Sequence, residues 1–124
     1  PKVIKCINQG LKFPLHGNGL TKRDFIFDDD FNDAFLKVLK KGKVGKTYHF
    51  STNNYVTVKR VIEIICNSKH VQFSDIVHKV SERKGKDKYY FLDCHKTSKE
   101  LKWKPKNTLT QGLTKTITYI DKYK

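Results

Sequence analysis

The chain has 124 residues, 37% of them hydrophobic, so we expect one domain, or part of one, with a modest core. Its formal net charge of +14 suggests nucleic acid as a partner, but the positive residues are spread along the whole chain and nearly all are lysine. No signal peptide or membrane-spanning stretch is found, and the first residue is Pro1, so we expect a cytoplasmic fragment of a longer chain.

The first quarter of the chain predicts short elements joined by glycine turns. Residues 2–12 are typical of a helix that stops near Gly10. The stretch 13–16 is predicted to be a short strand, at a sheet edge because of its proline. Glycines at 17 and 19 then supply a tight turn, and the apolar stretch 23–27 is predicted to be a second strand.

The clearest helix signal covers residues 30–41. Asp30 is a good N-cap, and Asp33 in the first turn suits the helix dipole. Gly42 is expected to end this helix. Residues at helical spacing predict one apolar face, formed by Phe31, Ala34, Phe35, Val38 and Leu39.

The middle of the chain predicts a strand over 46–51 and a polar loop over 52–54. Thr57 is expected to cap a further helix, and the stretch 71–80 is expected to be extended. The apolar face of this helix consists of Val58, Val61, Ile62 and Ile65.

The last third begins with a charged loop over 81–88 and a predicted strand over 89–93. Asp93 is expected to cap a short helix that Pro105 terminates, with Trp103 packed inside. A final helix is also predicted, with Thr110 as its cap and Leu109 as a hydrophobic staple. Its apolar face is formed by Leu113, Ile117 and Ile120. This alternation predicts a small mixed α/β unit that occupies residues 1–124 as one domain.

The metal-ligating residue types show no metal-binding pattern. Cys6, Cys66 and Cys94 are widely spaced without a CxxC pair, which favours free thiols in a reducing compartment. The histidines lack HExxH or similar spacing. The acidic run 28–30 allows a cation site or a capped helix start, and the helix start is favoured because the run lacks the ligand spacing of a calcium loop. We therefore predict no metal.

Several polar residues suited to ligand binding lie in loops at the ends of predicted strands. Arg23 stands beside the glycine turn, and Arg83 lies in the loop "ERKGKD". Two arginines can each hold one phosphate of a diphosphate, because the planar guanidinium binds phosphate with paired hydrogen bonds. Asn54 offers an amide, and 14–16 offers an edge strand with a flat histidine ring for stacking. Their shared placement in loops favours a binding site.

Two longer stretches carry a resemblance to a known family. The stretch "QGLKFPLHGNGLTKRDFIFDDDFNDAFLKVLKKGKVGKTYHFSTNN" resembles the C-terminal part of extended short-chain dehydrogenase/reductases that act on nucleotide sugars. The later "ERKGKDKYYFLDCHKTSKELKWKPK" is most similar to the dTDP-glucose 4,6-dehydratase branch of this NAD-dependent epimerase/dehydratase family. The resemblance implies a small α/β substrate-binding portion of a Rossmann-type enzyme, with the Rossmann half absent from these residues.

The resemblance also implies individual roles in substrate binding. Arg23 and Arg83 would bind the diphosphate, Asn54 would contact the nucleotide, and Pro14, Leu15 and His16 would flank the base. The segment that lies against the nucleotide would be Lys2, Val3 and Ile4. No catalytic residue is assigned within the chain.

For the whole enzyme, the resemblance implies an NAD-dependent lyase. It oxidises a nucleotide sugar at C4, eliminates water across C5 and C6, and returns the hydride to C6. NAD and the catalytic Tyr-xxx-Lys pair would belong to the N-terminal Rossmann half, so this chain would not be catalytic alone. The expected partners are a dTDP-hexose, that Rossmann half and, in the full-length enzyme, a second copy in a homodimer.

Three alternatives stay open from the sequence. A UDP-sugar 4-epimerase of the same architecture would prefer UDP over dTDP. A basic nucleic-acid-binding module would bind oligonucleotides with an affinity that falls steeply with salt. A stand-alone remnant that serves as an interaction surface would bind no nucleotide.

Overall fold

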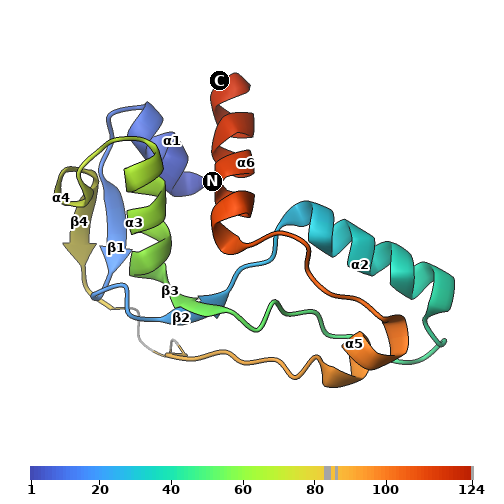
Figure 1. Cartoon of the computed structure of the whole chain (residues 1–124). Helices are drawn as coiled ribbons and strands as arrows, with labels where there is room; N and C mark the ends of the chain where they lie inside the picture. The colour runs from blue at the N-terminus through green and yellow to red at the C-terminus, as the bar shows by residue number, and fades with distance from the viewer. Residues whose placement is uncertain (83–84, 86, 124) are drawn as a thin grey trace.

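A computed structural model of the chain describes residues 1–82, 85 and 87–123. Figure 1 shows two packed parts, with a small two-stranded ribbon between them. The architecture is the mixed α/β unit that the sequence predicts.

The first part is built from α1 (Lys2–Asn8), β1 (Phe13–His16), α3 (Val58–Ser68), α4 (Phe73–Ile76), β4 (Val77–Val80) and α6 (Leu109–Lys122). The predicted cap of α3 is confirmed, because the Thr57 side chain accepts a hydrogen bond from the Arg60 backbone N–H. For α6 the predicted cap is wrong. Thr108, and not Thr110, caps this helix through a reciprocal capping box with Gln111.

Two short sheets fix the relative positions of distant segments. β1 pairs in parallel with β4, and His16 lies opposite Val80. β2 (Lys22–Asp24) pairs antiparallel with β3 (Tyr55–Thr57), and Arg23 lies opposite Val56. The strand predicted over 23–27 is therefore shorter than expected, and β4 and α4 divide the stretch that was expected to be extended throughout.

The second part consists of α2 (Asp28–Lys41) and α5 (His95–Leu101). Asp30 was expected to cap α2, but it lies inside the first turn and is 2% exposed. Its carboxylate instead accepts hydrogen bonds from the Lys106 and Asn107 backbone N–H groups and from the Asn107 side chain, at 2.9–3.1 Å. Asp30 thus fastens the segment before α6 to the start of α2.

The caps of α5 also differ from expectation. Cys94, and not Asp93, is the N-cap residue, although the Asp93 carboxylate accepts a hydrogen bond from the His95 backbone N–H at 2.9 Å. The helix ends at Leu101, before Pro105 is reached, and its C-cap residue Lys102 adopts a left-handed conformation with φ 49°. Trp103 packs inside as predicted and is 1% exposed.

Two predicted strands, 46–51 and 89–93, are irregular in the structure. Their side chains have the apolar character of a strand, but a strand also needs a neighbouring backbone for its hydrogen bonds. Within the described part of the chain, the pairing strands are only β1 with β4 and β2 with β3. Neither of the two segments consequently forms part of a ladder.

The hydrophobic core is divided between the two parts. The larger cluster joins α1, β1, α3 and α6 around Ile4, Leu15, Ile62 and Ile65. The smaller cluster joins Ala34 of α2 to Leu101 and Trp103. Only part of the apolar face of α2 is buried, because its side chains divide between the cluster and the surface. Those on the surface, 48–68% exposed, are Phe31, Phe35, Leu36 and Leu39. Among the described residues, no helix is both long and apolar enough to cross a membrane.

Candidate functional site

Arg23 connects β2 to the charged loop that begins at residue 81. Its guanidinium donates hydrogen bonds to the backbone carbonyls of Lys22 at 2.7 Å and Asp87 at 2.9 Å. The Lys22 backbone N–H also bonds the Lys88 carbonyl at 3.1 Å. The end of the loop is therefore held against β2 by two neighbouring residues.

The beginning of the same loop is held by the end of β1. A ring nitrogen of His16, Nδ1, lies 3.1 Å from the Ser81 carbonyl, and the Gly17 backbone N–H bonds the Val80 carbonyl at 2.9 Å. Gly17 has φ +58°, a conformation that glycine adopts without a steric penalty. His16 and Arg23, both predicted as ligand-binding residues, thus hold the two ends of one loop. Arg83, the other predicted arginine, belongs to this loop but lies outside the described residues.

Asp24 fastens the loop that carries Asn54 to the same ribbon. Its carboxylate accepts hydrogen bonds from the Thr52 backbone N–H at 2.5 Å and from the hydroxyls of Ser51 and Thr52. The Asn54 backbone N–H donates to the Thr52 hydroxyl at 3.2 Å, and the exposed Asn54 residue lies immediately before the first residue of β3. Arg23 and Asn54 are therefore positioned by adjacent strands.

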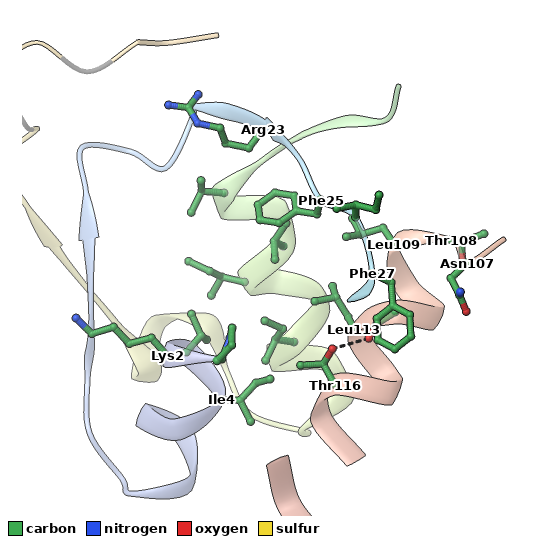
Figure 2. Close-up of a pocket in the computed structure, with 18 of the residues that line it drawn as sticks. Lys2, Ile4, Arg23, Phe25, Phe27, Asn107, Thr108, Leu109, Leu113 and Thr116 are labelled. Carbon is green, nitrogen blue, oxygen red and sulfur yellow. Dashed lines mark hydrogen bonds between the residues drawn. The ribbon is translucent and has the colours of Figure 1, made fainter. Parts of the chain in front are cut away.

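A largely apolar groove of about 500 Å³ lies between α1, α3, α6 and residues 25–27. Figure 2 shows Arg23 at one end of the groove and Lys2 on one side of it, with the Phe27 ring and the Leu113 side chain on the opposite side and the Phe25 ring between Arg23 and Leu113. The groove combines an apolar wall with cationic side chains at its margin. Such a surface suits a ligand that carries both a ring system and negative charge.

The structure brings together only part of the predicted site. Lys2, Val3, Ile4 and Arg23 line the groove. Ile4 is almost completely buried and contributes to the wall of the groove, whereas Leu15 is buried in the core away from it. Those that do not line the groove are Pro14, Leu15, His16 and Asn54.

Sequence reasoning missed the contribution of the chain before α2 and of α6. Phe25, Phe27, Leu109, Leu113 and Thr116 also line the groove. The spacing of Leu109, Leu113 and Thr116 at three to four residues places them on one helix face, and this signal was available. Asp24 was also missed, although a carboxylate within an otherwise apolar stretch indicates a need for local hydrogen bonding.

The sequence contains one Tyr-xxx-Lys spacing, formed by Tyr55 and Lys59. The Tyr55 hydroxyl lies on β3, 3.2 Å from the Ser51 hydroxyl and 3.1 Å from the Leu92 backbone nitrogen. The Lys59 ammonium instead lies on α3, 3.8 Å from Glu63 and 5.9 Å from the centre of the Phe73 ring. The two groups therefore serve different contacts.

The cysteines have the properties of structural thiols. All three are free; Cys66 and Cys94 are buried and Cys6 is partly exposed. Burial raises the pKa of the Cys66 thiol, with a smaller contribution from Glu63, and burial likewise raises the pKa of Cys94. Among the described residues, no three His, Cys, Asp or Glu side chains gather in a way that could hold a metal ion.

Comparison with known proteins gives consistent results over almost the whole chain. The family described as GDP-mannose 4,6 dehydratase matches residues 1–116. A dTDP-glucose 4,6-dehydratase of Haemophilus influenzae is 33% identical over 129 aligned residues, which cover 96% of this chain and 38% of that protein.

Solved structures agree with the sequence comparison. The dTDP-glucose 4,6-dehydratase DesIV of Streptomyces venezuelae, with NAD and TYD bound, is 30% identical and superposes with a TM-score of 0.92 over 98% of this chain and 38% of that one. A UDP-glucose 4-epimerase of Thermotoga maritima with UDP-glucose superposes with a TM-score of 0.89 over 98% of this chain and 38% of that one; at 24% identity it shows the fold alone.

The chain thus spans about 38% of the length of the relatives that it matches, and it corresponds to their C-terminal portion. The resemblance inferred from the sequence to extended short-chain dehydrogenase/reductases is confirmed. The chain belongs to the family described as GDP-mannose 4,6 dehydratase, whose relatives include the dTDP-glucose 4,6-dehydratases.

Proposed function

We propose that this chain is the nucleotide-sugar-binding part of an NAD-dependent sugar-nucleotide 4,6-dehydratase. The observation that carries the proposal is the pair of contacts that hold the 81–88 loop, one from His16 and one from Arg23. Arg23 lines the apolar groove and also bonds the Asp87 carbonyl at the end of this loop. A diphosphate at the loop and an attached base or sugar along the groove would use both features.

In this proposal the chemistry is divided between two parts of a larger enzyme. These 124 residues contain no GxGxxG dinucleotide fingerprint, so they do not fit the NAD site, and we assign NAD to a companion Rossmann part. This chain would bind and orient the substrate, whereas the companion part would supply the cofactor and the acid–base groups for loss of water. Full activity as a lyase then requires both parts in one geometry.

Titration of the 124-residue chain with dTDP, followed by calorimetry, tests the proposal. Arg23→Ala is expected to weaken dTDP binding by roughly ten- to a hundredfold, the range for loss of a charged hydrogen bond. Arg60→Ala is the matched control, because Arg60 is an exposed arginine that forms an ion pair with Glu63 on α3. Equal affinity of the two variants would contradict the assignment of Arg23.

A second titration with UDP separates the dehydratase from the epimerase candidate. The epimerase reading has the support of a shared fold, since the Thermotoga maritima 4-epimerase superposes over 98% of the chain. Preference for dTDP over UDP would favour the dehydratase, and the reverse preference would favour the epimerase. The absence of binding to either nucleotide, with oligonucleotide binding that falls steeply with salt, would favour a nucleic-acid-binding module.

A further inference from the structure

Five lysines line a hollow of about 530 Å³ at the junction of α2 and α5. They are Lys37, Lys99, Lys102, Lys104 and Lys106. None of them lines the groove next to Arg23. The hollow is therefore a concentration of positive charge separate from the proposed nucleotide-sugar site.

The backbone between α5 and α6 directs these lysines outward. From 101 to 106 burial alternates, so that Leu101 and Trp103 are buried whereas Lys102, Lys104 and Lys106 are exposed. The Trp103 side chain is fixed by a 3.2 Å hydrogen bond from its indole N–H to the Asp30 carbonyl. Because Trp103 anchors the segment, the flanking lysines face solvent on one side of it.

Lys102 has a backbone conformation that normally favours glycine. It ends α5 with φ 49° and ψ 44°, in the left-handed region. The Lys37 ammonium donates a 2.9 Å hydrogen bond to the Lys102 carbonyl, which holds this helix end in place. A side chain at such a position opposes the local conformational preference, and strain of this kind is often retained where the side chain has a function. At Lys102 that side chain adds a cation to the hollow.

The positive charge of the hollow is only partly neutralised. The Asp33 carboxylate lies 3.9 Å from the Lys37 ammonium and 3.4 Å from that of Lys106. Within the described parts of the chain, no carboxylate forms an ion pair with Lys99, Lys102 or Lys104. Ammonium groups bind phosphate as point charges, and several close together favour a ligand with several adjacent negative charges. The aromatic residue of the lining, Trp103, is buried, so the hollow offers no ring surface for a base to stack on.

We propose that this hollow is a second anion site, which takes a small ligand with two or more adjacent phosphate groups and recognises the phosphates rather than a base. Binding neutralises mutual repulsion among the lysines, so occupancy stabilises the fold in addition to holding the ligand. The site is independent of the proposed nucleotide-sugar function.

The test uses inorganic tripolyphosphate, the 124-residue chain and two double variants that each remove two positive charges. Lys102→Gly with Lys104→Gln changes the hollow, and Lys12→Gln with Lys79→Gln changes two exposed lysines of the first part. We expect the affinity for tripolyphosphate, measured by calorimetry, to fall about five- to tenfold in the first variant only. A decrease of this size is what the loss of two exposed ion pairs would cause. The thermal stabilisation by tripolyphosphate should also shrink only in that variant.

The hollow variant is expected to fold, because glycine is favoured at position 102. Equal loss of affinity in the two double variants would overturn the proposal, since binding would then follow total lysine charge. Absence of tripolyphosphate binding to the unaltered chain would also overturn it. Displacement of tripolyphosphate by dTDP at stoichiometric occupancy would place both at one site and contradict the separate hollow.

Discussion

The Arg23 guanidinium donates a 2.9 Å hydrogen bond to the Asp87 carbonyl, 64 positions away in the sequence. This contact, together with the backbone bond between Lys22 and Lys88, closes the 81–88 loop against β2. An arginine is well suited to the position because its planar fork reaches the Lys22 carbonyl with one nitrogen and the Asp87 carbonyl with another. The same residue can therefore order the loop and present positive charge beside it.

Replacement of this arginine by lysine tests its part in holding the loop. In Arg23→Lys the charge is retained, but a single ammonium lacks the fork that joins the two carbonyls. Loss of about 1 kcal/mol of local hydrogen bonding predicts roughly fivefold faster tryptic cleavage at Lys88. Arg60→Lys is the control and should leave this rate unchanged. An unaltered cleavage rate in Arg23→Lys would show that Lys22 and His16 suffice to hold the loop.

The local features of the fold could be predicted from the sequence, whereas its long-range contacts could not. The Thr57 cap and the apolar face of Val61, Ile62 and Ile65 depend on residues within one helix, and both are confirmed. The strand predicted over 46–51 is wrong because strand formation depends on a partner that the local pattern cannot specify. Asp30 was a reasonable cap by residue type, but its actual partners lie 76 and 77 positions away.

In the candidate site, too, the residues could be selected from local sequence features, whereas the contacts between distant segments could not be predicted. Arg23 and Asn54 could be selected because polar residues at strand ends often bind ligands, and the resemblance to a family gave them specific roles. Asp24 could not be recognised as the residue that positions the Asn54 loop, because its bonds to Ser51 and Thr52 cross 27 and 28 positions. The groove itself requires the packing of α1 against α3 and α6, which no local pattern encodes.

Asp30 should stabilise the fold in a pH-dependent manner. Burial acts to raise its pKa, but hydrogen bonds from Lys106 and Asn107 and the nearby Lys106 charge together lower the pKa from its ordinary value of 3.8. A carboxyl group whose pKa is lowered in the folded state stabilises that state at pH values above its ordinary pKa. This contribution is lost as the pH falls through the folded-state value.

Asp30→Asn is therefore expected to lower the free energy of unfolding by roughly 1.5–3 kcal/mol near neutral pH. The difference from the unaltered chain should shrink as the pH falls below about 4, because protonation removes the same charge. Urea denaturation over a pH series measures this difference. Asp75→Asn, at an exposed residue of α4, serves as the control. A difference that does not change with pH would exclude the charge of Asp30 as its origin.

The exposed stripe on α2 predicts association of the 124-residue chain. Phe31, Phe35 and Leu39 repeat every four residues along one side of the helix and are 48–68% exposed. Contiguous apolar side chains on a surface favour contact with other apolar surfaces. Phe35→Glu with Leu39→Lys leaves net charge unchanged and should reduce both dye binding by anilinonaphthalene sulfonate and concentration-dependent light scattering. The matched control is Tyr119→Glu with Tyr123→Lys, at two exposed aromatic residues of the other part. Equal effects of the two pairs would assign association to general surface hydrophobicity.

The cysteines should react in two distinct phases. Cys6 is partly exposed, whereas Cys66 and Cys94 are 1% and 3% exposed and have raised pKa values because they are buried. The reactive species is the thiolate, so both buried thiols are protected by inaccessibility and by their protonation state. With a chromogenic disulfide reagent at pH 8, we expect one thiol to react promptly and two to react only at the rate of local opening.

Cys6→Ser should remove the prompt phase, and denaturant should merge all phases into one.

The raised pKa values of the two buried thiols also predict an alkaline effect on stability. The neutral thiol is favoured in the folded state, so its contribution is complete below the ordinary pKa of 9.0 and is lost as the pH rises through the higher folded-state value. Cys66→Ala should lose less stability than the unaltered chain between pH 8 and about pH 11. The same alkaline slope in both proteins would show that the pKa of Cys66 is not raised in the folded chain.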